Sequence, residues 1–133
     1  MAAFTYVAGS GRCRVYGRFF DTAAGYIVHL MGGTRPHVGA VALGWPRPSL
    51  AGRRLSATAS VLTLTAHKDD ELARPAALAL AAGLKAAVVV VAGVHIEAAA
   101  PADLDRLEFN AWRVIAGILK VQRWQRGNPV VLK

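Results

Sequence analysis

The sequence predicts an α/β fold, a two-layer sandwich in which helices are packed on one face of a mixed, mostly antiparallel sheet. Three observations predict it. β-branched and aromatic residues gather in short segments in the first half of the chain, an apolar pattern of helical period begins at Leu72, and four consecutive valines follow at residues 88–91. The resulting element order is β-β-β-β-α-β-α. Since 133 residues, 54% of them hydrophobic, suit one core, we expect a single domain over residues 1–133.

Four strands are expected before the first helix, in segments rich in β-branched and aromatic residues. Gly17 lies inside the first segment and predicts a bulge there. The second and third segments are separated by Gly32 and Gly33 and are expected to form a hairpin-like pair. Two prolines, a glycine and three arginines in Pro46–Arg54 predict a surface loop. The expected strands are Arg14–Phe20, Tyr26–Met31, Val38–Trp45 and Leu55–Thr65.

A helix and a buried strand are expected next. Pro75 restricts the start of the helix, because proline in a helix interior clashes with the carbonyl four residues earlier. The regular helix therefore begins near Arg74 with Pro75 in its first turn, or a preceding turn is bent there. The uninterrupted apolar segment Ala87–Val91 is typical of a central strand buried on both faces, and it makes a βαβ-like crossover plausible. The helix is predicted by an apolar face of four residues: Leu72, Ala76, Leu80 and Leu84.

The last helix is expected to start at Pro101, because proline is favoured at the first helical position. Phe109, Trp112 and Leu119 lie off its main apolar stripe, which indicates either a homodimer interface or wide burial under neighbouring chain. Beyond the helix, Val130–Leu132 would be a short extension or an edge strand. The main stripe consists of Leu104, Leu107, Ala111, Val114, Ile115 and Ile118.

The net charge of +8 would suit an anionic partner. The basic residues are spread along the chain, however, without a dense basic run, zinc-finger spacing or an aromatic RNP-type strand, so we expect no nucleic-acid partner. No apolar run reaches the ~18 residues that a membrane span needs, and the first residues do not resemble a signal peptide. A single cysteine, Cys13, cannot form an intramolecular disulfide. We therefore expect a cytoplasmic protein with no membrane partner.

The first of three polar clusters follows the second expected strand and contains Gly32, Gly33, Arg35, Pro36 and His37. Paired glycines can adopt positive φ and let a ligand approach the backbone, and an arginine can bind a phosphate. An ordinary hairpin turn explains the same residues. The spacing matches neither a Walker A loop nor a dinucleotide-binding loop.

The second cluster, from His67 through Lys68 and Asp69 to Asp70 and Glu71, stands at the entrance of the first helix. Backbone N–H groups at a helix N-terminus attract anions, which favours a ligand there. Carboxylates at this position also stabilise the helix through its dipole, so a purely structural role explains the cluster equally well.

The third cluster places His95 and Glu97 just after the buried strand, two residues apart and so on one face of an extended chain. Carboxyl ends of central strands are common ligand sites in α/β sheets, although a histidine may simply cap a loop there. His37, His67 and His95 all fall at strand ends and could assemble a metal site for a hydrolase or lyase. No HxH, HExxH or CxxC spacing supports this alternative.

The three clusters, in this order, resemble the LpdD-like prenylated-flavin chaperone family, formerly described as the small subunit of gallate or hydroxyarylic acid decarboxylases. The resemblance covers most of the chain from about Tyr26 to the last helix. It is carried by GGTRPHVGAVAL (Gly32–Leu43), HKDDELARPAALALAAGL (His67–Leu84) and VVVVAGVHIEAA (Val88–Ala99).

This resemblance implies a non-catalytic accessory protein that binds prenylated FMN, or FMN, and assists its maturation in, or delivery to, a UbiD-type decarboxylase. The flavin prenyltransferase would be a second partner, and a purely structural decarboxylase subunit is an alternative. Lys68 or Arg35 would hold the phosphate. We expect no catalytic or metal-binding residues, a homodimer, and a cofactor site made of Gly32, Gly33, Arg35, Pro36, His37, His67, Lys68, Asp69, His95 and Glu97.

Overall fold

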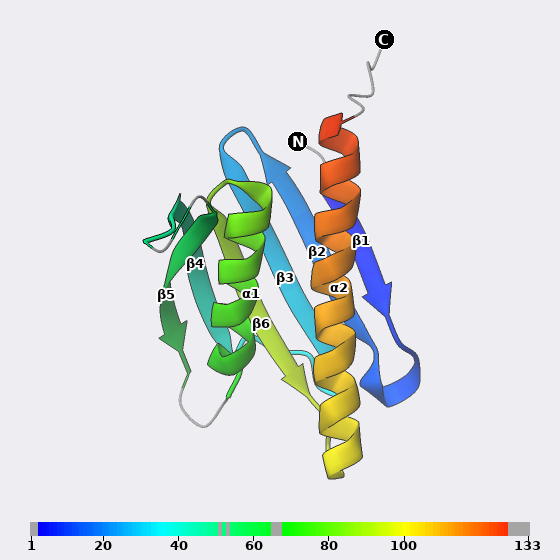
Figure 1. Cartoon of the computed structure of the whole chain (residues 1–133). Coiled ribbons are helices and arrows are strands. Elements are labelled where there is room, and N and C mark those ends of the chain that lie inside the picture. The colour runs from blue at the N-terminus through cyan, green and yellow to red at the C-terminus, as the bar shows by residue number, and fades with distance from the viewer. Residues whose placement is uncertain (1–2, 51, 53, 65–67, 128–133) are drawn as a thin grey trace.

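The computed structural model describes the backbone of residues 3–50, 52, 54–64 and 68–127, and side chains as far as residue 122. In this part of the chain, one mixed six-stranded sheet carries two α-helices on the same face, which confirms the predicted fold class (Figure 1). The elements in chain order are β1 (Ala3–Ala8), the 3-10 helix η1 (Gly11–Cys13), β2 (Val15–Thr22), β3 (Gly25–Gly33), β4 (Ala40–Pro48), β5 (Leu55–Thr63), α1 (Asp70–Leu84), β6 (Val88–His95) and α2 (Pro101–Gly127).

Strand β1 was not expected from the sequence. It pairs antiparallel with β2 along its whole length, from Ala3 opposite Phe20 to Ala8 opposite Val15. Phe4 and Tyr6 point toward the core on alternate positions, which is the period of a half-buried edge strand. The segment is short and contains alanine and glycine neighbours, so its strand pattern is weak. Val130–Leu132 lies outside the described residues.

The sheet order is β1-β2-β3-β6-β4-β5, so β6 lies between β3 and β4. It runs parallel to β3 and antiparallel to β4. The expected hairpin of the second and third strands is therefore wrong. The connecting segment instead crosses the end of β6, where the backbone N–H groups of Thr34, His37 and Gly39 bond carbonyls of residues 92–95. The valine run thus forms a central strand, as expected.

Strand β4 continues through Pro46 to Pro48, where a loop was expected. Proline is tolerated because the pairing of β4 with β6 ends at Gly44, so the side of β4 next to β6 makes no ladder bonds beyond that point. The expected bulge at Gly17 is also absent, since β2 pairs in regular register there. A Cβ at Gly17 would collide with Val114 of α2, so the glycine lets the helix approach the sheet closely.

Helix α1 begins at Asp70, with Asp69 as its N-cap, rather than near Arg74. Pro75 consequently lies inside the helix, in its second turn. The two turns form nonetheless, because the buried side chains of Leu72, Ala73 and Ala76 pack the helix against the sheet.

Helix α2 starts at Pro101, as predicted, and extends to Gly127. Of the residues off its main stripe, Trp112 and Leu119 are partly buried against the core, whereas Phe109 is 64% exposed. Leu104, expected in the stripe, is 53% exposed. Among the described residues, no helix is both long and apolar enough to cross a membrane.

Candidate functional site

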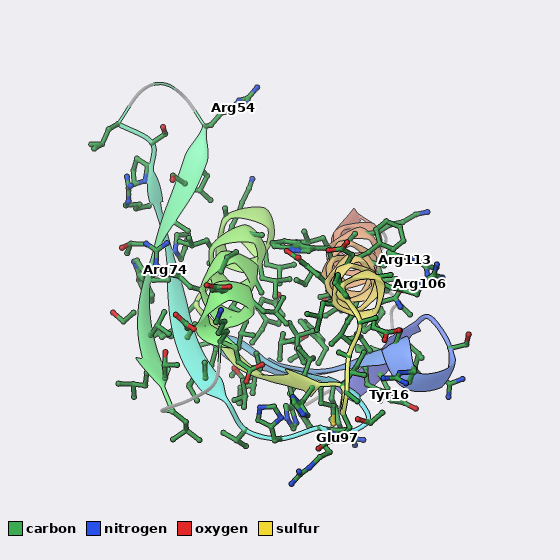
Figure 2. The ribbon with its side chains drawn as sticks, turned by 90° about the horizontal axis from the view of Figure 1, so that it is seen from below. Tyr16, Arg54, Arg74, Glu97, Arg106 and Arg113 are labelled. Carbon is green, nitrogen blue, oxygen red and sulfur yellow. The ribbon has the colours of Figure 1, made fainter. Side chains whose placement is uncertain are left out.

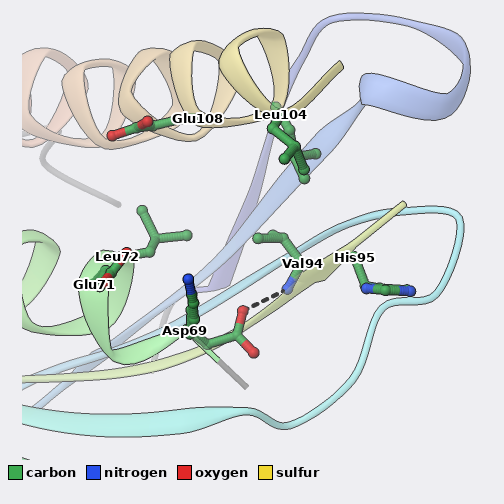
Figure 3. Close-up of a pocket in the computed structure, with 9 residues that line it drawn as sticks. Asp69, Glu71, Leu72, Val94, His95, Leu104 and Glu108 are labelled. Carbon is green, nitrogen blue, oxygen red and sulfur yellow. Dashed lines mark hydrogen bonds between the residues drawn. The ribbon is translucent and has the colours of Figure 1, made fainter. Parts of the chain in front are cut away.

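Asp69 joins three segments at one end of the sheet. Its side chain is 5% exposed. One carboxylate oxygen, Oδ1, accepts a hydrogen bond from the backbone N–H of Val94 in β6 at 3.1 Å (Figure 3). The other, Oδ2, lies 2.8 Å from Nε2 of His37 in the segment before β4. A Cβ at Gly39 would collide with this carboxylate, so only glycine leaves room for it. The N-terminus of α1 is therefore fixed to the end of β6.

His37 has an acceptor beside each ring nitrogen. Nδ1 lies 2.9 Å from the carbonyl oxygen of Arg35, and Nε2 faces the Asp69 carboxylate. A carbonyl and a carboxylate only accept, so both bonds are complete when the ring is a doubly protonated imidazolium. The bond to the Arg35 carbonyl raises the pKa of His37 above its ordinary value, and the Asp69 carboxylate raises it further, against a lowering by burial and by the Arg35 charge.

The glycines of the first cluster pack tightly against neighbouring backbone. Gly33 has φ +81°, and a Cβ there would meet the backbone of His95. A Cβ at Gly32 would meet the Arg14 carbonyl, and one at Gly93 would meet the His37 carbonyl. Close approach of two chain segments therefore requires glycine at these positions, independently of any ligand.

Arg35 and Glu97 form an exposed ion pair just outside this cluster. Arg35 NH1 lies 3.0 Å from Glu97 Oε1, and the two side chains are 73% and 56% exposed. His95 Nε2 lies 3.6 Å from the same oxygen. The hydrogen bond from Arg35 is the main reason why the pKa of Glu97 is lowered. The carboxylate thus neutralises much of the charge that Arg35 would offer to a phosphate.

A pocket of about 460 Å³ opens where the start of α1, the end of β6 and the first turns of α2 meet (Figure 3). Its wall is mixed. Leu72, Val94, Leu104 and Leu107 supply apolar surface, and Lys68 supplies a positive charge beside the α1 N-terminus. The remaining lining residues are Asp69, Glu71, His95 and Glu108. Pockets of this size, mostly apolar with a few polar groups, are typical of small-molecule and cofactor sites, whose volumes run from about 300 to 1,000 Å³.

The profile of the prenylated flavin chaperone LpdD-like domain family matches residues 9–123 of the 133. The chain belongs to this family. The match includes all three polar clusters, every strand after β1, and α2 through residue 123. A comparison with curated proteins found no match.

The structure brings most of the predicted site residues of this LpdD-like domain to one end of the sheet. Lys68, Asp69 and His95 line the pocket. His37 contacts Asp69, and its ring centre lies 6.4 Å from that of His95. The remaining predicted site residues do not line the pocket. Arg35 and Glu97 pair at the surface, Gly32 and Gly33 pack against backbone, Pro36 is exposed, and His67 lies outside the described residues.

Sequence reasoning missed the other lining residues, above all those of α2. Leu104 and Leu107 were assigned to the apolar stripe of the last helix, and Leu72 to that of the first helix. Leu104 alone carried a usable signal. It is an apolar residue in the first turn of a helix, and such a residue can lie past the edge of the sheet. Glu71 was assigned to the second cluster but not to the cofactor site, and Glu108 carried no distinguishing pattern.

Over the described part of the chain, no group of three or more histidine, cysteine, aspartate or glutamate side chains is close enough to hold a metal ion. Of the three histidines weighed for a metal site, His37 and His95 are neighbours. The third, His67, is not in the described part.

Proposed function

We propose that this LpdD-like domain binds prenylated FMN, or FMN, in the pocket between α1, β6 and α2. The domain does not catalyse a reaction itself, and it assists the maturation of the flavin in, or its delivery to, a UbiD-type decarboxylase. The observation that carries the proposal is the pocket of about 460 Å³ beside the family's shared motifs. A flat apolar ring suits Leu72, Val94, Leu104 and Leu107.

Lys68 is the better candidate than Arg35 for the phosphate. It lines the pocket and stands at the positive end of the α1 dipole, whereas Arg35 is outside the lining and already paired with Glu97. Glu71 of α1 and Glu108 of α2 also line the pocket and would repel a phosphate. The phosphate should therefore lie on the Lys68 side and the ring farther toward α2.

The state of His37 supports a carrier rather than a catalyst. Both of its ring nitrogens are held by protein acceptors, so the His37–Asp69 pair is not arranged to remove a proton from a ligand. The flavin prenyltransferase would supply the flavin. We also propose that the protein is a cytoplasmic homodimer, since Cys13 is a buried free thiol and homodimers are the commonest soluble assemblies.

The test is co-expression with a flavin prenyltransferase, followed by an absorbance and a mass spectrum of the purified protein. We expect stoichiometric prenylated FMN and no turnover by the protein alone. Lys68→Ala should weaken flavin binding about 10-fold or more, the value of a charge-assisted hydrogen bond. Lys85→Ala, at the far end of α1, is the matched control and should leave affinity unchanged.

A colourless protein that also fails to take up added reduced prenylated flavin would contradict the carrier function and leave the purely structural subunit. Binding that depends on Arg35 and not on Lys68 would retain the function but move the phosphate to the Arg35 loop.

A further inference from the structure

No described segment of the chain covers the face of the sheet opposite the helices. Both helices lie on one side of the sheet (Figure 2). Because side chains alternate along a strand, every second residue of each strand points to the other side. In the middle of the four inner strands β2, β3, β6 and β4 these are Tyr16, Arg18, Phe20, Ile27, His29, Met31, Val89, Val91, Val41, Leu43 and Trp45. We call this set the open face.

The open face carries apolar side chains although it faces solvent. Ile27 is 42% exposed, Leu43 is 49% exposed and Trp45 is 58% exposed. The cross-strand pairs place Ile27 beside Val89 and Val89 beside Leu43, so the apolar surface is continuous across the central strands. Large contiguous apolar patches on a soluble domain mark interaction sites.

Charge is nearly absent from this surface, although the chain carries a net charge of +8. Among the described strand residues, alternation puts only Arg18 of β2 and Arg47 of β4 on this side, away from the two central strands. The Arg18 guanidinium lies 5.5 Å from the centre of the Phe20 ring and so covers an apolar side chain. Depletion of charge at the centre is typical of the core of an interface.

A histidine at the centre of the open face also has an unmet hydrogen bond. His29 stands on β3, paired with Val91 of β6 at the middle of the sheet. Its Nε2 atom is buried and has no hydrogen-bond partner among the described residues. A buried polar atom without a partner is unfavourable, but this atom is already covered by its own chain, so a partner on the open face would contact only the accessible remainder of the ring.

The open face, together with the edge strands β1 and β5 on the same side of the sheet, is about the size of one standard interface. Six strands spaced ~4.8 Å apart, each ~25 Å long, give an area of ~700 Å². A stable complex buries about 800 Å² on each partner. Homodimer interfaces are also more apolar than transient ones, which are about as polar as the remaining surface.

We propose that the open face packs against the open face of a second copy of this chain, sheet on sheet, about a two-fold axis. This surface replaces the α2 face as the homodimer interface, since Phe109 is largely exposed but Trp112 and Leu119, the other two residues named off the α2 stripe, are partly buried against the core. The flavin pocket lies on the helix side of the sheet, so both pockets of the dimer stay open. The interface is therefore independent of flavin binding.

The experiment measures molar mass across a concentration series by sedimentation and light scattering. The wild-type chain should have twice the mass of one chain. Leu43→Glu and Ile27→Glu should each weaken the dimer at least ~100-fold, because a carboxylate would be buried without a partner. Phe109→Glu is the matched control on α2 and should stay dimeric. Circular dichroism should be native for all three, and affinity for FMN or its prenylated form should be unchanged.

Acrylamide quenching of Trp45 in a single-tryptophan variant gives a second readout that leaves the open face itself unchanged. Quenching should fall as concentration rises through the dissociation constant. A monomeric wild-type chain would overturn the proposal, even if it bound a decarboxylase through Leu43. A dimer that Phe109→Glu dissociates, and that both open-face variants leave intact, would also overturn it.

Discussion

Asp69 is the residue on which the geometry of the site depends most. Its carboxylate connects the start of α1 to β6 through Val94 and to the segment before β4 through His37. It is also the N-cap residue of α1, yet its side chain makes no capping bond to the helix. The carboxylate is thus used for tertiary contacts, and the first-turn N–H groups of residues 71–73 bond backbone carbonyls of Lys68 and Asp69 instead.

The pairing of His37 predicts a pH dependence of stability. The folded-state pKa of His37 is raised above its ordinary value of 6.5, so the ring binds its proton more tightly in the folded than in the unfolded chain. The stability that the protonated His37 ring contributes is complete below about pH 6.5 and is lost as the pH rises through the folded-state pKa. NMR titration should show the raised pKa of His37 in the wild type and a lower one in Asp69→Asn.

Urea unfolding provides the thermodynamic half of this test. The wild type should lose more stability than Asp69→Asn between about pH 6 and pH 8, where histidine titrates. Asp70→Asn, one residue along the same helix, is the control and should keep the wild-type profile. An unshifted pKa of His37 in the wild type would contradict this prediction.

Helix α1 contains a local defect that predicts a stabilising substitution. Pro75 lies in the second turn and has no N–H, so the Glu71 carbonyl lacks the usual partner four residues later. Proline inside a helix costs about 3 kcal/mol relative to alanine, and its stiffening of the unfolded chain returns ~0.4–1 kcal/mol. Pro75→Ala should therefore raise the free energy of unfolding by about 2 kcal/mol.

Chemical denaturation with urea measures this change. Ala79→Gly, one turn later in α1, is the matched control and should lower stability by about 1 kcal/mol. An unchanged or lower stability of Pro75→Ala would mean that packing of the proline ring outweighs the lost hydrogen bond.

The same helix illustrates what local patterns could predict. Apolar periodicity predicted both helices, and an uninterrupted apolar run predicted the buried valine strand. Both signals depend on which side chains face the core. The start of α1 was placed too late, because proline propensity was given priority over the burial of Leu72 and Ala73. The position of β6 between β3 and β4 could not be predicted from the sequence, since it depends on tertiary hydrogen bonds from Thr34, His37 and Gly39 to the end of β6.

The candidate site was predictable to a similar extent. Strand ends and the helix entrance identified Lys68, Asp69 and His95, because chain breaks at one sheet edge come together in space. The pairing of Arg35 with Glu97, 62 residues apart, needed the folded structure. So did the wall that α2 supplies, because Leu104 and Leu107 look like ordinary core residues in the sequence.

The molecule has two parts that meet at β6. Helix α2 packs on β1 and β2, whereas α1 packs on β4 and β5, and β6 joins β3 to β4 (Figure 1). Because every ladder between the two parts passes through β6, both β3 and β4 lose a ladder partner when β6 detaches. Unfolding should therefore be a single cooperative transition.

Two tryptophans report on the two parts separately. Trp45 lies on β4, and Trp112 lies on α2. In single-tryptophan variants, fluorescence from either residue should give the same urea midpoint as circular dichroism. Separate midpoints would show that the β4–β5–α1 part unfolds independently of the β1–β3–α2 part.

The wall of the pocket that α2 provides is synthesised last. During translation, the sheet through β6 and the Asp69 contacts can form while residues 104–108 are still inside the ribosome. A nascent chain at that stage has the Lys68 and Asp69 side of the pocket but lacks the wall that Leu104 and Leu107 supply. The pocket is therefore completed only after α2 has left the ribosome, and a partly made chain cannot enclose a small molecule there.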